Sequence, residues 1–182
     1  MSIEKTLVMA EHLLTMPKDG YRYALVKGEL RKMPLNGARH GSTVALILSF
    51  VGDFVRNHKL GKTFAPGTGF LLYRAPDTVR APDVAFVSRE RLPEGEIPAT
   101  FLEMAPDLVV EVVSPNDTAA EVQEKVEEWL RAGTRMVWVV YPNIHSVTVF
   151  RSLSEVQVLG ESESLNSAPV LPGFSCQVNQ LF

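Results

Sequence analysis

Two apolar segments of strand length each contain one interior carboxylate, and no other feature of the sequence constrains the fold as much. Residues 81–87 read APDVAFV and contain Asp83, whereas residues 107–114 read DLVVEVVS and contain Glu111. An ionised Asp or Glu in a buried strand loses its hydration, so it requires a compensating partner. Because a predicted helix that carries Lys125 follows these strands, we predict a divalent-metal site with a lysine beside it.

Each carboxylate also has an ordinary structural interpretation. Asp83 follows Pro82 and can form a strand-entry turn, in which its side chain accepts backbone hydrogen bonds at the surface. Glu111 can lie at a sheet edge or pair with an arginine such as Arg80. Taken singly, each carboxylate is better explained by structure. The two together with Lys125, in this order of elements, favour a functional site.

The composition indicates one globular domain with a sizeable core. The chain has 182 residues, of which 46% are hydrophobic and 21% are charged, and its net charge is −3. This mild acidity argues against a constitutive nucleic-acid coat protein, which needs a basic surface, but not against a nuclease that carries a metal. Cys176 is the only cysteine, so an intrachain disulfide and zinc-finger spacing are excluded.

The sequence gives no sign of export or membrane insertion. Residues 1–5 (MSIEK) lack the apolar segment of a signal peptide, and no apolar run is long enough to cross a bilayer. We therefore expect a cytoplasmic protein that makes no membrane contact.

Hydrophobic periodicity and turn residues predict both helices and strands. Helices are expected over residues 6–14, with Thr6 as a cap, over 39–58, and from a cap at Asp117 or Thr118 to Ala132. Strands are expected at 21–26 and 29–33 (a hairpin), 62–64, 69–73, around Asp83, around Glu111, and at 136–141, 146–151 and 155–159. The apolar residues of 169–174 should dock the tail on the body.

These elements predict an α/β (α+β) fold in which a mixed β-sheet is flanked by helices, with an N-terminal helix and β-hairpin. No internal repeat or linker divides the sequence, so we expect a single domain over residues 1–182. Within it, residues 1–37 form the N-terminal helix and hairpin, 38–152 the core, and 153–182 the C-terminal edge strand and tail.

Several motifs, in order along nearly the whole chain, resemble the Uma2 family. They are APDV at 81–84, LVVEVVSP at 108–115, Lys125 with RAG at 131–133, and VWVV at 137–140; GEL at 28–30 and Arg39-His40 resemble the opening segment of the family. That family is grouped with the PD-(D/E)XK restriction-endonuclease-like proteins. The resemblance implies a restriction-endonuclease-like core and an endonuclease that hydrolyses DNA phosphodiester bonds with Mg²⁺ or Mn²⁺. A homodimer is also implied, because cutting duplex DNA needs two active sites.

The resemblance also implies a ligand set and a catalytic lysine. Asp83, Glu111 and the main-chain carbonyl of Val112 would hold the metal, since hard cations prefer oxygen ligands. The superfamily lysine normally lies two residues after the second carboxylate, but this sequence has Val113 there. Lys125 resembles the migrated lysine of related members and would orient the attacking water or stabilise charge. Alternatively, Lys125 belongs to a plain charged helix face with its neighbouring glutamates.

Four further residues are weaker site candidates. The resemblance makes Glu29 a candidate third carboxylate near the metal, although a solvent-facing strand residue is the alternative. His40 is a candidate contact to phosphate or metal, or a residue that caps its helix. Ser114 is a candidate substrate contact but is better explained as a turn cap. Glu121 is a candidate to orient Lys125 from one helical turn away.

A second class of function is kept open: a catalytically silent nuclease-fold protein that binds nucleic acid or protein and regulates another process. The acidic charge, the absence of lysine at Val113 and the lack of a recognisable DNA-recognition module support it. A third possibility is a toxin-like or mobile-element-associated nuclease that is active only in a complex.

Overall fold

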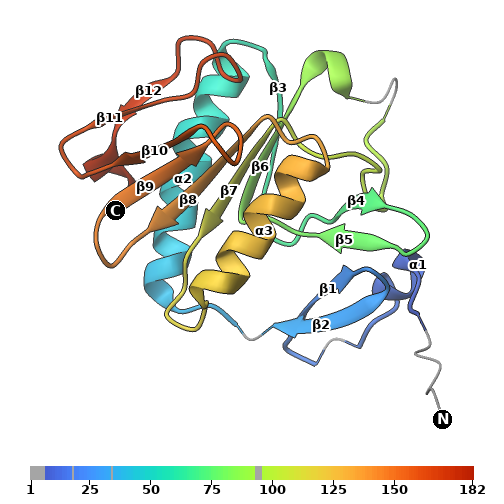
Figure 1. The fold of residues 1–182 in the computed structure, drawn as a ribbon. Coiled ribbons are helices and arrows are strands. Elements are labelled where there is room, and N and C mark those ends of the chain that lie inside the picture. Colours follow the sequence, from blue (N-terminus) through green and yellow to red (C-terminus); the bar gives the residue numbers. More distant parts are fainter. Residues whose placement is uncertain (1–6, 18, 34, 93–95) are drawn as a thin grey trace.

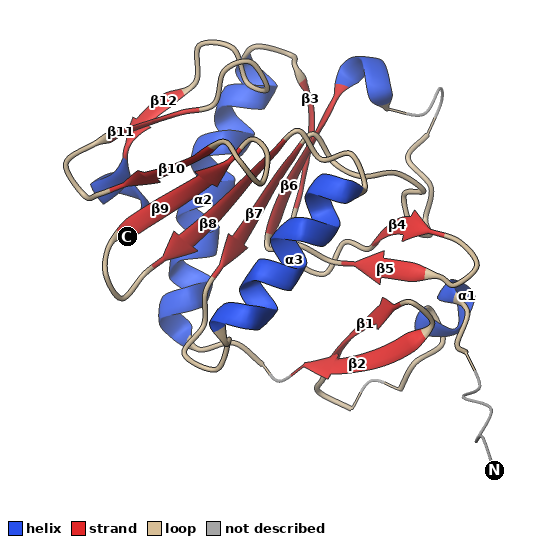
Figure 2. Ribbon diagram, viewed as in Figure 1, coloured by secondary structure: helices blue, strands red, loops and turns tan. Residues whose placement is uncertain are grey.

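A six-stranded mixed sheet lies between two long helices (Figures 1 and 2). The computed structural model describes residues 7–17, 19–33, 35–92 and 96–182. The strand order is β10-β9-β8-β7-β6-β3. The strands are β3 (Gly61–Phe64), β6 (Val84–Ser88), β7 (Leu108–Val112), β8 (Met136–Tyr141), β9 (Ser146–Phe150) and β10 (Val156–Leu159), and the helices are α2 (Ala38–Asn57) and α3 (Ala119–Arg131).

Among the described strands of this sheet, β7 and β8 are the only parallel pair, and the other pairs are antiparallel. Parallel neighbours need a crossover connection, which α3 supplies. The chain therefore leaves the end of β7, turns, and enters α3 at the same end of the sheet. This topology brings Glu111, in β7, close to the first turns of α3.

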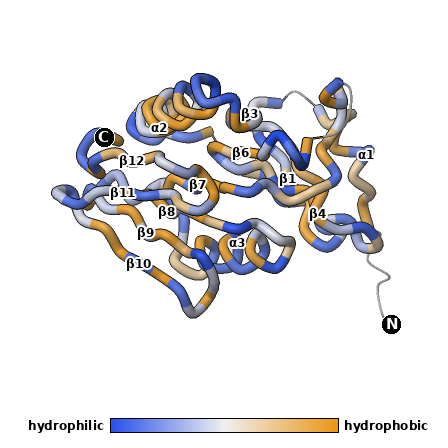
Figure 3. Tube along the Cα trace, turned by 90° about the horizontal axis from the view of Figure 1, so that it is seen from above, coloured by the Kyte–Doolittle hydropathy of each residue, from blue (hydrophilic) through white to orange (hydrophobic). Residues whose placement is uncertain are grey.

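Alternation along the strands sorts the apolar side chains into two cores. Phe86 and Val110 belong to the core on the α2 face, which also contains Ile47, whereas Ala85 and Val109 belong to the core on the α3 face. Viewed from above, the strands that lie between α2 and α3 consist largely of hydrophobic residues (Figure 3). Because side chains alternate between faces with a period of two, Asp83 shares a face with Ala85, and Glu111 with Val109.

A second, four-stranded sheet lies beside the central one, with strand order β2-β1-β5-β4. Its strands are β1 (Arg22–Val26), β2 (Glu29–Met33), β4 (Phe70–Tyr73) and β5 (Thr78–Arg80), and the short helix α1 (Ala10–Leu13) packs on it. The far ends of the β1–β2 hairpin, Arg22 and Met33, are paired in register. These ends face the central sheet across the cavity described below.

The C-terminal segment closes the α2 face. It contains β11 (Ser164–Asn166), β12 (Ser175–Gln177) and the 3₁₀ helix η2 (Val178–Leu181), and another 3₁₀ turn, η1 (Arg89–Arg91), follows β6. Leu171 and Phe174 are buried in the core that contains α2. The predicted docking of the tail is therefore confirmed.

The predicted mixed α+β fold is confirmed, as are the hairpin, both long helices, the central strand β8 and the edge strand β10. The first helix is shorter than expected, because Met9 precedes it in extended backbone and the Val8 N–H donates to the Gly28 carbonyl. Thr6, its expected cap, lies outside the described residues. The strand β5 was not predicted, and β3 and β4 belong to different sheets.

Gly61 begins β3 where that strand lies against β6. Its φ is +155°, and a Cβ on this residue would lie 2.1 Å from the carbonyl oxygen of Val87. Real Cβ atoms do not approach backbone oxygen this closely, so the two strands pair here because residue 61 has no side chain.

We expect Gly61→Ala to lower the free energy of unfolding by roughly 2–4 kcal/mol, because the methyl group forces β3 away from β6. The matched control is Gly133→Ala, where φ is also positive (+103°) but a Cβ meets no atom within 4 Å. The control should lose only the strain of the left-handed backbone, about 1–2 kcal/mol. Urea unfolding of both variants measures the difference, and equal losses would contradict the clash.

Candidate active site

One cavity, of about 180 Å³, is lined by Asp83, Glu111 and Lys125 together. It is lined by residues of the β1–β2 hairpin, the start of α2, the segment just before β6, the end of β7 and the first turns of α3, and we call it the carboxylate cavity. The three residues come from three different elements of the chain. Both carboxylates are therefore on one face of the sheet, and the lysine points toward them.

Asp83 lies directly before β6 and is fixed by the backbone of β7. Its N–H donates to the Val110 carbonyl at 3.1 Å, which extends the ladder by one residue. Its Oδ2 accepts the Val112 N–H at 2.9 Å. The Asp83 side chain therefore accepts a hydrogen bond from β7 at a point before β6 begins, where no β6 carbonyl is available.

His40 is the second group that holds Asp83. It lies in the first turn of α2 and is buried, and its Nε2 is 3.2 Å from Asp83 Oδ2. The Asn36 amide nitrogen lies 3.0 Å from the same ring. On the other side, Arg22 Nη1 is 4.0 Å from Asp83 Oδ1. His40 thus orients a site carboxylate, and Oδ1 is the oxygen on the side of the basic hairpin.

Glu111 is bound through both oxygens by side chains of α3. The Trp129 indole N–H donates to Oε1 at 2.8 Å, and Lys125 Nζ lies 3.6 Å from Oε2. Lys125 and Trp129 are four residues apart, so they occupy the same helix face, one turn apart. Trp129 is also fully buried among the apolar residues of the α3 core.

Sequence reasoning assigned Trp129 to core packing alone and so missed its contact with Glu111. A signal for it was present, because a buried indole N–H requires an acceptor. The spacing from Lys125 points to Glu111 as that acceptor. The proposed pairing of Glu111 with Arg80 is not what the structure has: Arg80 pairs with Glu128 of α3.

Asp117 is a further charged residue of the cavity that sequence reasoning took only for a possible helix cap. Its Oδ1 is 3.5 Å from Lys125 Nζ, and its Oδ2 accepts the Ser114 N–H at 2.8 Å. Lys125 is therefore held between Glu111 and Asp117. Ser114 lines the cavity, and its turn is closed by the Asp117 side chain.

The cap of α3 is Thr118, in a capping box with Glu121. Glu121 accepts hydrogen bonds from the Thr118 N–H at 2.9 Å and from its hydroxyl at 2.7 Å. Although Glu121 lines the cavity, its hydrogen bonds hold the helix start, and Asp117 takes the position next to Lys125 that was predicted for Glu121.

The structure does not bring Glu29 to the carboxylate cavity. Glu29 is exposed and pairs in register with Val26, beside the hairpin turn. Lys32 and Met33, at the opposite end of β2, are the β2 residues that line the cavity. The register of the hairpin thus separates Glu29 from Asp83, and its candidate role as a third carboxylate gains no support from the geometry.

Burial and neighbouring charges shift the two titrating groups on α3 and β7. Burial raises the pKa of Glu111; Asp83 raises it further, whereas Lys125 and the Trp129 hydrogen bond act in the opposite direction. Burial alone would lower the pKa of Lys125, but the charges of Glu111, Asp117 and Asp83 outweigh it, so that pKa is raised. Lys125 therefore remains a cation, and Glu111 is the group whose ionised form a bound cation would favour.

The donors of the cavity fit a hard divalent cation that retains water ligands. The available protein donors are carboxylate oxygens of Asp83 and Glu111 and the Val112 carbonyl, all of them oxygen. The Val112 N–H points to Asp83, and in an extended strand the carbonyl of the same residue points to the same side. Among the described residues, no group of three or more His, Cys, Asp or Glu side chains is arranged to bind a metal ion by itself. Mg²⁺ commonly binds through one or two carboxylates and waters, so two carboxylates suffice.

With this geometry established, comparison with known proteins identifies the family. A sequence model of Uma2, described as "Putative restriction endonuclease", matches residues 10–179. The chain belongs to the Uma2 family. No curated protein matches it. The crystal structure of a "putative nuclease belonging to DUF820" from Anabaena variabilis ATCC 29413 is similar, with a TM-score of 0.83 and 21% sequence identity over 96% of this chain and 97% of that chain.

The Uma2 match confirms the family predicted from the motifs, and the likeness to the Anabaena protein shows a shared fold. In the described part of the chain, no helix combines the length and apolarity needed to cross a membrane. The roles of the individual cavity residues stay predictions.

A double-mutant cycle tests whether Trp129 positions Glu111. We expect Trp129→Phe to cost roughly 2 kcal/mol of unfolding free energy in the parent, because Glu111 Oε1 loses a buried donor. In a Glu111→Leu background, the same change should cost much less, because no carboxylate requires the indole N–H. Urea unfolding of the four proteins gives the coupling energy. Equal costs in the two backgrounds would show that the indole only packs.

The pKa of Glu111 predicts a pH-dependent difference between the parent and Glu111→Gln. A carboxyl group whose pKa is raised on folding, here above its ordinary value of 4.5, contributes stability at acid pH that is lost as pH rises through the folded pKa. The free energy of unfolding of the Gln variant should therefore rise relative to that of the parent between pH 4 and pH 8. Urea unfolding at both pH values measures this, and a difference that does not change with pH would contradict it.

Proposed function

We propose that this Uma2 protein is a metal-dependent endonuclease that hydrolyses phosphodiester bonds in DNA. The observation that supports this proposal most is the convergence of Asp83, Glu111 and Lys125 on one cavity. A lysine 3.6 Å from one buried carboxylate, with a second carboxylate beside it, offers both ligands for a cation and a positive group for the substrate. Membership of a family described as "Putative restriction endonuclease" agrees with this chemistry.

The residues divide into groups that hold the cation and groups that act on the substrate. Asp83, Glu111 and the Val112 carbonyl would bind Mg²⁺ or Mn²⁺, which when bound polarises the scissile phosphate and lowers the pKa of a water molecule. Lys125 would donate a hydrogen bond to the attacking water or to a phosphate oxygen.

Three neighbours position these groups. His40 holds Asp83, Trp129 holds Glu111, and Asp117 holds Lys125. Because their partners are buried or half-buried, these contacts fix the direction of each reacting group before substrate arrives.

The rim of the cavity is suited to the phosphate backbone. Arg22 and Lys32, on the β1–β2 hairpin, line the cavity, and their side chains are 34% and 47% exposed. Cations at this position attract polyanions to a protein whose net charge is −3.

We further propose a cytoplasmic homodimer, in which each copy cuts one strand of a duplex.

Cleavage assays with purified protein and a labelled DNA duplex test the proposal. In Mg²⁺ or Mn²⁺ the parent should cleave, and EDTA should abolish cleavage. Asp83→Asn, Glu111→Gln and Lys125→Met should each reduce the rate by about 10²–10⁴-fold, because each removes a metal ligand or a stabilising charge. Glu127→Gln is the control, because it also removes a charge from α3, but Glu127 pairs with Arg131 and does not line the cavity.

The silent binding protein is the alternative outcome of the same assay. Val113, which takes the place of the superfamily lysine, is the observation that favours it. Tight binding of single-stranded, double-stranded or structured nucleic acid by the parent, without cleavage in either metal, would establish this second function. Asp83→Asn and Glu111→Gln variants that cleave like the parent would contradict the assigned site.

A further inference from the structure

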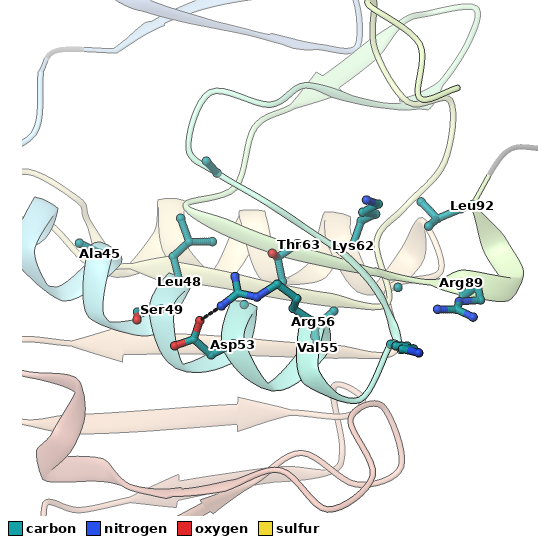
Figure 4. Close-up of a pocket in the computed structure, with 14 residues that line it drawn as sticks. Ala45, Leu48, Ser49, Asp53, Val55, Arg56, Lys62, Thr63, Arg89 and Leu92 are labelled. Atoms are coloured by element: carbon teal, nitrogen blue, oxygen red, sulfur yellow. Dashed lines mark hydrogen bonds and ion pairs between the residues drawn. The ribbon is translucent and has the colours of Figure 1, made fainter. Parts of the chain in front are cut away.

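A second and larger recess lies away from the carboxylate cavity, between the C-terminal half of α2, the edge strand β3 and the η1 turn (Figure 4). Its volume is about 760 Å³. Four cations line it, Arg56, Lys59, Lys62 and Arg89, against a single carboxylate, Asp53. We call it the basic groove. A local excess of three positive charges is notable in a chain whose net charge is −3.

Three of the four cations of the basic groove differ from most other described lysines and arginines in having no internal partner, and Arg56 is the exception. Arg56 pairs with Asp53 at 2.6 Å. The side chains of Lys59, Lys62 and Arg89 have no carboxylate or hydrogen-bond partner among the described residues. Lys27 is the only other described lysine or arginine whose side chain lacks such a partner. Three unpaired cations around one recess thus form a surface that an anion would complement.

The backbone at Lys59 adds a second observation. Lys59 follows the cap of α2 with φ +53°, and the Leu60 N–H donates to the Val55 carbonyl at 3.0 Å, which closes the helix. Glycine is the usual residue at this left-handed position, because a side chain there is strained. A lysine is present instead, and its side chain lines the groove.

The floor of the groove allows close approach of a backbone. Ala45, Ser49 and Gly52 lie on one face of α2, with Thr63 of β3 opposite. These small side chains leave room between the cationic rims. Leu48, Val55 and Leu92 add apolar surface to the lining, so the feature that favours an anionic occupant is the excess of cations and not a polar floor.

We propose that the basic groove binds the sugar–phosphate backbone of nucleic acid outside the cleavage site. This inference rests on the proposed function, since it assigns the groove to the flanking part of the same substrate. Along α2, the helix rises by about 24 Å from His40, at the carboxylate cavity, to Arg56, at the groove, sixteen positions later. A polyanion that reaches beyond the cavity gains contacts in addition to those of Arg22 and Lys32 at the cavity rim.

The test is equilibrium binding of the full chain in EDTA, where no metal-dependent cleavage occurs. Fluorescence anisotropy is measured with a labelled 20-base-pair duplex and a 20-nucleotide single strand over a range of salt concentrations. The triple variant Lys59→Gln, Lys62→Gln, Arg89→Gln is compared with the triple variant Lys27→Gln, Arg131→Gln, Arg151→Gln. The two have the same net charge, and the residues changed in the second do not line the groove.

The groove variant should bind at least one of the two substrates about 10-fold or more weakly than the control variant. For the duplex, the slope of log K against log salt should fall by about 3, because each lost phosphate contact removes about 0.9. Lys59→Gly separates charge from folding: relief of the strained backbone should keep or raise the Tm, while affinity falls about threefold. A Lys59→Gly variant with raised Tm and parental affinity counts against a binding role.

Three results would overturn the inference: groove and control variants that bind equally, a parent protein that binds neither substrate, or groove variants that shift a dimer to monomer while DNA affinity stays constant. The last result would make the groove an interface between copies. Groove-dependent binding by a parent that does not cleave in Mg²⁺ or Mn²⁺ would support the inference while the proposed function fails. Cleavage that depends on Asp83, together with unchanged binding by the groove variant, would overturn the inference alone.

Discussion

The site of this protein depends on how the buried carboxylate of Glu111 is compensated. Glu111 lies in β7, whose other residues are all apolar, and both of its carboxylate oxygens are contacted by side chains from a single helix, α3. Trp129 and Lys125 can do this together only in one rotational setting of that helix. Trp129 also fills the core between α3 and the sheet. Core packing and site geometry are therefore determined by the same contact.

The topology of the central sheet explains why charged groups gather at one end of it. The parallel β7–β8 pair requires a crossover, so the end of β7 and the start of α3 lie together. Asp83 enters at the same point because β6 begins there, and His40 reaches it from the start of α2. Helices from both faces of the sheet thus meet at the same end of its strands. Side chains held by buried contacts lose little freedom when substrate binds, which suits a catalytic site.

The sequence allowed Asp83 and Glu111 to be predicted because a charge inside an apolar strand stands out, whereas Lys125 was predicted from the order of the elements and the family resemblance. It did not reveal Asp117 as a partner of Lys125, since an acidic residue before a helix is normally a cap. Trp129 was hidden for the opposite reason, because a tryptophan on an apolar helix face needs no explanation beyond packing. Glu29 was placed near the metal by resemblance, but hairpin register puts it beside the turn. Register is set by pairing, which local sequence specifies poorly.

By itself, the sequence determined the periodicity of the elements, the mixed sheet flanked by helices, the family, and which carboxylates lie in apolar strands. These properties follow from residue spacing along the chain, where hydrophobic burial acts on each segment in turn. Only the tertiary structure decided which groups contact each carboxylate oxygen, which acids hold Lys125, and that three unpaired cations line one groove. Those facts depend on distances between segments far apart in sequence, which no local pattern encodes.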